Sequence, residues 1–151
     1  LYNQWLDHSK TLMDSSHSQS KMQSDLNQTE SEFLQIREMM DQAGEELRIH
    51  TNKQQQDKVG SELLSRYVEA MAEVLNADRD IYQARLAKQK IVNQHGELAQ
   101  NQKLFEENAA QVIRRFNSYR SYLIDEPQLT QKYANFDKLY QQWYEKGKAL
   151  V

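Results

Sequence analysis

The residues best suited to bind a ligand lie near the middle of the 151-residue chain, where acidic and basic side chains alternate. Asp78 falls on an apolar stripe, inside the segment Asn-Ala-Asp-Arg-Asp-Ile-Tyr-Gln at 76–83. If the helices on either side of Gly96 form a hairpin, positions whose numbers sum to roughly 190 face each other, which places Asp78 near Arg115. The pattern predicts an ion pair between Asp78 and Arg115 that fixes the register of the two helices.

The same region has a second interpretation, as a binding site for a small molecule. Arginine presents a planar fork of donors that matches a carboxylate, and small-molecule pockets combine such groups with aromatic and amide side chains. A pocket between helices for an organic or amino acid anion would be lined by Arg79, Tyr82, Arg85, Asn108, Arg114 and Arg115. Both interpretations are kept as hypotheses.

Other chemistries lack the spacing that they need. The four histidines, His8, His17, His50 and His95, include no pair three or four residues apart, and the chain contains no Cys. Two metal ligands on one helix face need that spacing, so no metal site is predicted. The serines next to His17 point in different directions on a helix, and no Gly-rich phosphate loop occurs. The sequence predicts neither a cofactor nor enzymatic activity.

Composition restricts the partners of the chain. The formal net charge is −3, and the basic side chains are interspersed with acidic ones, so we expect no nucleic-acid partner. The apolar runs are too short to cross a bilayer. Because the chain begins with Leu1 rather than Met and ends at Val151, we expect a fragment whose membrane segments lie outside it.

The elements that would position these residues are helices. One Pro and four Gly in the whole chain, with abundant Gln, Glu, Lys, Leu and Ala, favour long helices over strands. Apolar residues recur at alternating steps of three and four within the segments 1–50, 58–93, 97–124 and 127–151. Short polar turns separate them, one of them opened by a capping box at Thr51 and Gln54 and another centred on Gly96. The sequence therefore predicts one all-α domain over 1–151, an antiparallel up-down-up-down four-helix bundle with a very long first helix.

The predicted helices differ in length. At ~1.5 Å per residue the first reaches roughly 75 Å and the fourth about 36 Å. We therefore expect either that the chain continues beyond Val151 or that a second copy packs against the start of the first helix. Such a homodimer would bury Trp5, Leu12 and Trp143.

Three stretches of the chain resemble a known family. The segment 76–83, the stretch Glu-Asn-Ala-Ala-Gln at 107–111 with Arg-Phe-Asn at 115–117, and Phe136 followed by Trp143 are similar to recurring segments in the extracytoplasmic sensor regions of bacterial methyl-accepting chemotaxis receptors. The resemblance covers roughly residues 63–150 and rests on unusual residues at fixed separations. The ligand-binding Arg and Thr positions of the aspartate and serine receptors have no match in this chain.

The resemblance implies a periplasmic ligand-binding domain of a homodimeric receptor in the bacterial inner membrane, which binds a small molecule and transmits a helix shift across the membrane to control a histidine kinase. The alternative is a structural or partner-binding helical bundle, such as an adaptor that docks another helix. Apolar segments of about twenty residues flanking the chain would favour the receptor, and polar domains would favour the adaptor.

Overall fold

The chain folds into helices that pack together. The computed structural model describes residues 2–57 and 60–151, and the surroundings of side chains at Asp7 and from Ser9 onward. It contains α1 (Tyr2–Gln56), α2 (Ser61–Val92), α3 (Leu98–Tyr122) and α4 (Phe136–Leu150), with two 3₁₀ turns at Pro127–Leu129 and Gln131–Tyr133. The predicted all-α class, with four helices packed against one another, is confirmed.

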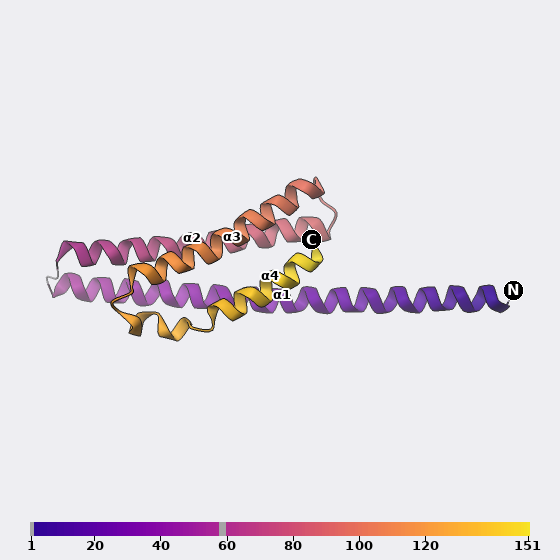
Figure 1. Cartoon of the computed structure of the whole chain (residues 1–151), viewed down its shortest axis with the longest axis horizontal. Helices are drawn as coiled ribbons and strands as arrows, with labels where there is room; N and C mark the ends of the chain where they lie inside the picture. Colours follow the sequence, from indigo (N-terminus) through magenta and orange to yellow (C-terminus); the bar gives the residue numbers. More distant parts are fainter. Residues whose placement is uncertain (1, 58–59) are drawn as a thin grey trace.

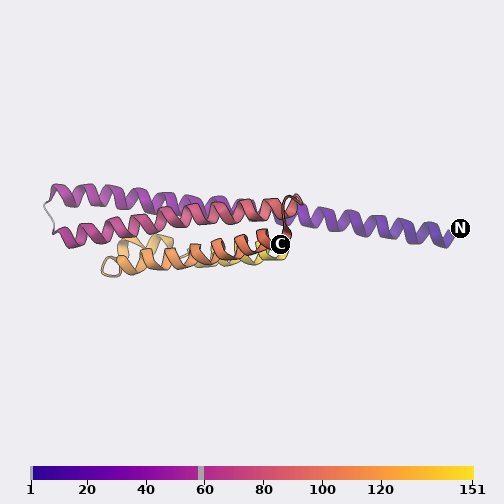
Figure 2. The ribbon, with the colours of Figure 1, turned by 90° about the horizontal axis from the view of Figure 1, so that it is seen from above.

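The first helix is much longer than the others, with 55 residues against 15 in α4. Its second half packs against α2 and α4, whereas its first half extends beyond the other helices (Figures 1 and 2). The contact between α2 and α3 is the most extensive between two helices, and α4 packs along α1 more extensively than along α3. No helix within the described residues is both long and apolar enough to cross a membrane.

Apolar side chains spaced by three and four build one continuous core, because this spacing places them on one face of each helix. α1 contributes Phe33, Ile36, Met40, Ala43 and Leu47, which are at most 2% exposed. α2 contributes mainly small residues, among them Ala70, Ala77 and Ala84, and α3 adds aromatic ones such as Phe105 and Phe116. Small residues on α2 opposite large rings on α3 allow these two helices to approach closely.

α4 contributes large aromatic side chains to the core. Phe136 stacks on Phe116 of α3 with ring centroids 3.5 Å apart, and Trp143 lies 5.8 Å from Phe105. Trp143 is fully buried inside the bundle. The expectation that a dimer would bury Trp143 is therefore wrong, because the core already covers it, whereas the side chain of Trp5 lies outside the described residues.

One charged side chain lies in this core. Lys88 of α2 is completely buried, and its ammonium donates to Thr29 Oγ1 of α1 at 2.7 Å, with Glu30 Oε1 3.7 Å away. Burial lowers the pKa of Lys88, and Glu30 opposes part of that effect. This lysine therefore links α1 and α2 by polar contacts.

The helix ends differ from those predicted at two places. α1 continues to Gln56 rather than stopping at residue 50, and Thr51 Oγ1 donates to the carbonyl of Leu47 instead of capping a new helix. The predicted fourth helix does not begin at Pro127, because two 3₁₀ turns precede Phe136. The predicted turn at Gly96 is present, with φ of +75° that glycine adopts without strain. The predicted start of the second helix at residue 58 lies outside the described residues.

Candidate functional site

Two of the four arginines singled out from the sequence bind one buried carboxylate. Asp80 of α2 is fully buried, and its Oδ1 accepts hydrogen bonds from Arg79 Nε at 3.0 Å and Nη2 at 2.8 Å. Arg115 of α3 donates from Nε to the other oxygen, Oδ2, at 2.6 Å and contacts Glu73 at 3.3 Å. The hydrogen bond to Asp80 raises the pKa of Arg115. This cluster joins α2 to α3.

The predicted pair between Asp78 and Arg115 is wrong by two residues. Asp78 instead accepts from Arg37 of α1, with Oδ2 2.9 Å from Nη2. Because successive helical residues are rotated by about 100°, positions 78 and 80 face nearly opposite directions. Asp78 therefore faces α1, and Asp80 faces α3.

The remaining predicted site residues do not converge. Arg85 donates to Glu30 of α1 at 2.7 Å, whereas Tyr82 and Arg114 are exposed. Asn108 lines a groove between α2 and α3, and its Nδ2 donates to the carbonyl of Leu104 at 2.8 Å. Three of the four predicted arginines thus pair with carboxylates of the chain, and the geometry offers no shared anion pocket among the six residues within the described part of the chain.

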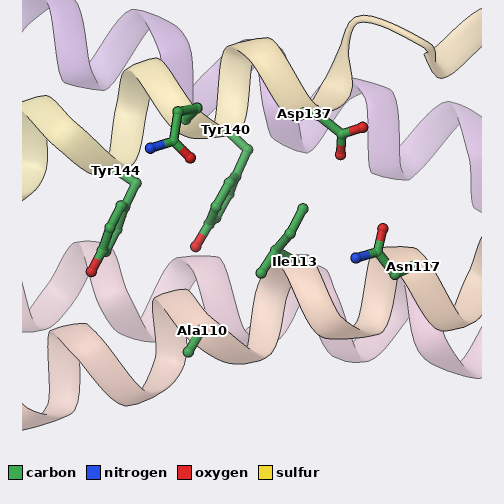
Figure 3. A pocket seen from close by; sticks show the side chains of 7 residues that line it. Ala110, Ile113, Asn117, Asp137, Tyr140 and Tyr144 are labelled. Carbon is green, nitrogen blue, oxygen red and sulfur yellow. The ribbon is translucent and has the colours of Figure 1, made fainter.

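A different concave site lies between α3 and α4 (Figure 3). It is an open groove of about 560 Å³. The lining residues are Ala110, Ile113 and Asn117 of α3 with Asp137, Tyr140, Gln141 and Tyr144 of α4. Ile113 and Ala110 form an apolar side, and the amide and carboxylate groups lie around it.

Two parallel tyrosine rings form one wall of this groove. The rings of Tyr140 and Tyr144 are 6.0 Å apart between centroids, with an angle of 5° between their planes. Their hydroxyl groups point toward α3, where Tyr140 donates to the carbonyl of Ala109 at 2.7 Å and Tyr144 donates to Glu106 at 2.5 Å. The hydrogen bond to Glu106, with burial, raises the pKa of Tyr144 to about 12. Both rings are therefore fixed at their outer ends and present rigid faces.

Asp137, which lines the groove, forms an ion pair with Arg120. Arg120 Nη1 lies 2.9 and 2.8 Å from the two carboxylate oxygens of Asp137, and its guanidinium lies 4.8 Å from the ring centre of Phe116. Asn117 Oδ1 is 3.5 Å from the same Nη1. A ligand entering here would meet aromatic faces, an amide and an ion pair, which can bind and orient a small molecule. Among the described residues, no group of three His, Cys, Asp or Glu is arranged to hold a metal ion.

A second groove follows the opposite side of α3. It has a volume of about 290 Å³ and is lined by Gln83, Leu86, Ala87 and Lys90 of α2 with Asn101, Leu104 and Asn108 of α3. Asn101 and Asn108 are 5% and 9% exposed. Of the predicted site residues, only Asn108 lines either groove.

Sequence reasoning missed the α3–α4 groove because Tyr140 belongs to the apolar stripe of α4 and the other lining residues flank the stripes of α3 and α4. A usable signal was the pair Tyr140 and Tyr144, four residues apart and hence neighbours on one face of a helix. Comparisons of the chain with protein-family models, curated proteins and solved structures found no match.

Proposed function

We propose that the chain is the extracytoplasmic ligand-sensing domain of a bacterial chemotaxis receptor, and that its ligand binds in the α3–α4 groove. The parent protein would be a homodimer in the inner membrane with this domain in the periplasm. Support comes from the chain's resemblance to such sensor regions at 76–83, 107–111 and 115–117. The all-helical architecture fits a sensor that transmits helix movement.

The proposal includes an antiparallel up-down-up-down order with a very long first helix. Contacts between α1 and α2 support this order, because Glu30 pairs with Arg85, and Arg37 pairs with Asp78. Farther along α1, His50 contacts Tyr67 at 3.1 Å, so residues later in α1 contact residues earlier in α2. Helices that alternate in direction return the chain to the side from which it started, as a domain between two membrane segments requires.

The observation that carries the proposal is the position of the groove beside α4. α4 is held to α3 through a few specific contacts, such as the hydroxyl of Tyr140 on the carbonyl of Ala109, and to α1 through Lys146 and Glu32. A ligand that bridges α3 and α4 would favour one packing of α4 over another. If it bound one packing a hundredfold more tightly, the equilibrium would shift by about 2.7 kcal/mol.

The test is ligand-induced thermal stabilisation of the purified domain. The panel comprises organic acids, amino acids, polyamines and nitrate, each with wild type and with Asn117→Leu and Tyr144→Ala, whose folding is checked by circular dichroism. We expect one chemical class to raise the melting temperature of the wild type by several degrees and the two variants to lose that shift. Retention of the full shift by both folded variants, or a flat response of the wild type, contradicts the proposal.

Arg79→Ala and Arg114→Ala provide the comparison with the sequence-based hypothesis. These arginines lie outside the α3–α4 groove, so we expect both variants to keep the ligand-induced shift. If either variant loses the shift while Asn117→Leu keeps it, the ligand instead binds at the arginine-lined site predicted from the sequence.

A second candidate function, partner binding by an exposed helix, is favoured by one observation. Leu12, Met13 and Met22 on the extended half of α1 are 47–66% exposed. Large apolar side chains at these positions would be covered if another helix packed along them. Partner capture on immobilised domain, with Leu12→Ser and Met22→Ser as variants, tests this function separately from ligand binding.

A further inference from the structure

The groove between α2 and α3 contains two asparagines whose placement the proposed function does not use. Asn101 and Asn108 are at least nine-tenths buried and occupy the same face of α3, two helical turns apart. Each is held by one hydrogen bond, from Asn101 Nδ2 to the carbonyl of His95 at 2.9 Å and from Asn108 Nδ2 to the carbonyl of Leu104 at 2.8 Å. Their amide planes are therefore oriented before any ligand arrives.

These bonds use only part of the capacity of each amide. An asparagine side chain has two N–H donors and a carbonyl oxygen that accepts, so one donor and the acceptor remain. Neither Oδ1 accepts a hydrogen bond from the described residues, and neither is among their fully buried, unpartnered atoms. Each oxygen therefore keeps some solvent exposure, and both residues line the α2–α3 groove.

Three apolar side chains line the groove beside this pair of amides, together with the polar Gln83. Leu86 of α2 and Leu104 of α3 are each 38% exposed and line the groove together with the buried Ala87. Lys90 is the single charged residue among the seven that line it. Such a site favours a flat molecule with apolar faces and one hydrogen-bonding edge over a multiply charged ion or a sugar, which would leave most of its polar groups unpaired.

We propose that the α2–α3 groove binds a nucleobase, whose edge pairs with an asparagine amide while its faces contact Leu86 and Leu104. An asparagine amide forms two parallel hydrogen bonds with a base edge that carries an adjacent donor and acceptor, as the N6 and N7 positions of adenine do. Apolar side chains on the two faces of a flat ring provide the remaining contact area. The groove volume of about 290 Å³ accommodates one such ring system with its solvent-facing substituent.

The α2–α3 site is independent of the α3–α4 groove, because no residue lines both. Loss of one site would therefore leave the other intact, and either proposal can fail alone. The two grooves lie on opposite flanks of α3, which makes α3 the shared wall of two separate binding sites.

Isothermal titration of the purified domain with adenine tests the assignment. We expect saturable binding with one base per chain, and binding of unsubstituted purine about tenfold weaker, because purine lacks the exocyclic amine that donates to the amide oxygen. Asn108→Leu keeps the helix and removes one amide, and Leu104→Glu places a charge at the wall of the groove. At least one of these variants should abolish adenine binding while the melting curve remains cooperative.

Asn52→Leu, at an exposed position of α1, is the matched control and should bind adenine as the wild type does. Absence of adenine binding by the wild type overturns the assignment, as does unchanged binding by both folded groove variants. Loss of adenine binding in Asn117→Leu, with retention in Asn108→Leu, would place the base in the α3–α4 groove. That result would overturn this assignment while supporting the proposed sensing site.

Discussion

The two halves of α1 have the same secondary structure and opposite environments. From Lys10 to Ser24 every side chain is exposed, whereas between Thr29 and Thr51 a buried residue recurs every three or four positions. The same three- and four-residue spacing continues through both halves. Its positions hold polar residues such as Ser15 and Gln19 in the first half, and apolar ones such as Phe33 and Ile36 in the second. Spacing therefore predicts a helix, and the size of the apolar side chains decides whether that helix packs.

The strongest test of this comparison is alkaline pH. Among the described residues, the tyrosines with raised pKa values lie in the segments that share a core with the second half of α1, and none lies in the extended half. Burial raises the pKa of Tyr67, Tyr119, Tyr133 and Tyr140, and the bond to Glu106 raises that of Tyr144. The folded state keeps these phenols neutral while the unfolded chain ionises near pH ~10, so stability is full below that pH and decreases as pH rises toward about 12.

We expect the melting temperature to fall over this interval by more than any single substitution below lowers it. Melting curves from pH ~9 upward, with tyrosinate absorbance followed in parallel, provide the measurement. Gradual ionisation of all tyrosines near pH ~10 without unfolding would contradict the buried hydroxyls of the packed region.

Two aliphatic residues on the packed half of α1 give the next largest effect. Ile36 is fully buried, so Ile36→Ala should lower the free energy of unfolding by about 2–5 kcal/mol. Leu34, two residues away and 62% exposed, is the matched control, and Leu34→Ala should change it by less than about 0.5 kcal/mol. Urea denaturation measures both, and similar losses would mean that the two faces of α1 are not distinguished by burial.

The buried carboxylate on α2 should have a smaller but clear effect. Asp80→Asn leaves Arg79 and Arg115 without their shared charge, and we expect a loss of about 2 kcal/mol in the free energy of unfolding. Asp125→Asn, which breaks the pair of an exposed carboxylate with Arg66, should cost less than about 0.5 kcal/mol. Equal effects in denaturant titrations would show that the α2–α3 ion pair contributes no more than a surface pair.

The smallest effect belongs to the extended half of α1. Leu12 is 58% exposed, so Leu12→Ala should leave the unfolding free energy within about 0.5 kcal/mol of the wild type in dilute solution. A loss that grows with protein concentration would instead indicate that a second copy covers this half, which an analytical centrifuge would detect as self-association.

More of the fold than of the candidate site could be predicted from the sequence. Helical spacing and the scarcity of Pro and Gly were enough for four packed helices, and Gly96 correctly marked the turn between α2 and α3. The boundary at Thr51 was wrong because a threonine hydroxyl can bond within a helix as well as cap one. The start of α4 was misplaced because Pro127 suits a 3₁₀ turn as well as an α-helix.

The candidate site depended on which direction each side chain faces around its helix axis, and residue spacing alone left that direction uncertain. For that reason the sequence predicted Asp78 as the partner of Arg115, whereas the partner in the structure is Asp80. The arginines attracted attention because they can bind an anion, yet the carboxylates that bind three of them lie on other helices or on the neighbouring position. Asn108 lines the α2–α3 groove without any of the predicted arginines, and the α3–α4 groove became evident only once α3 and α4 were positioned.

Lys88 gives the domain a built-in chemical reporter. Its amine is enclosed between α1 and α2, so an acylating reagent can reach it only when those helices separate. The exposed amines of Lys10 and Lys21 on the same molecule would be acylated at once and provide an internal standard. Mass spectrometry of the acylated peptides would then time the opening of the α1–α2 interface, with and without a bound molecule, in the native chain without any introduced label.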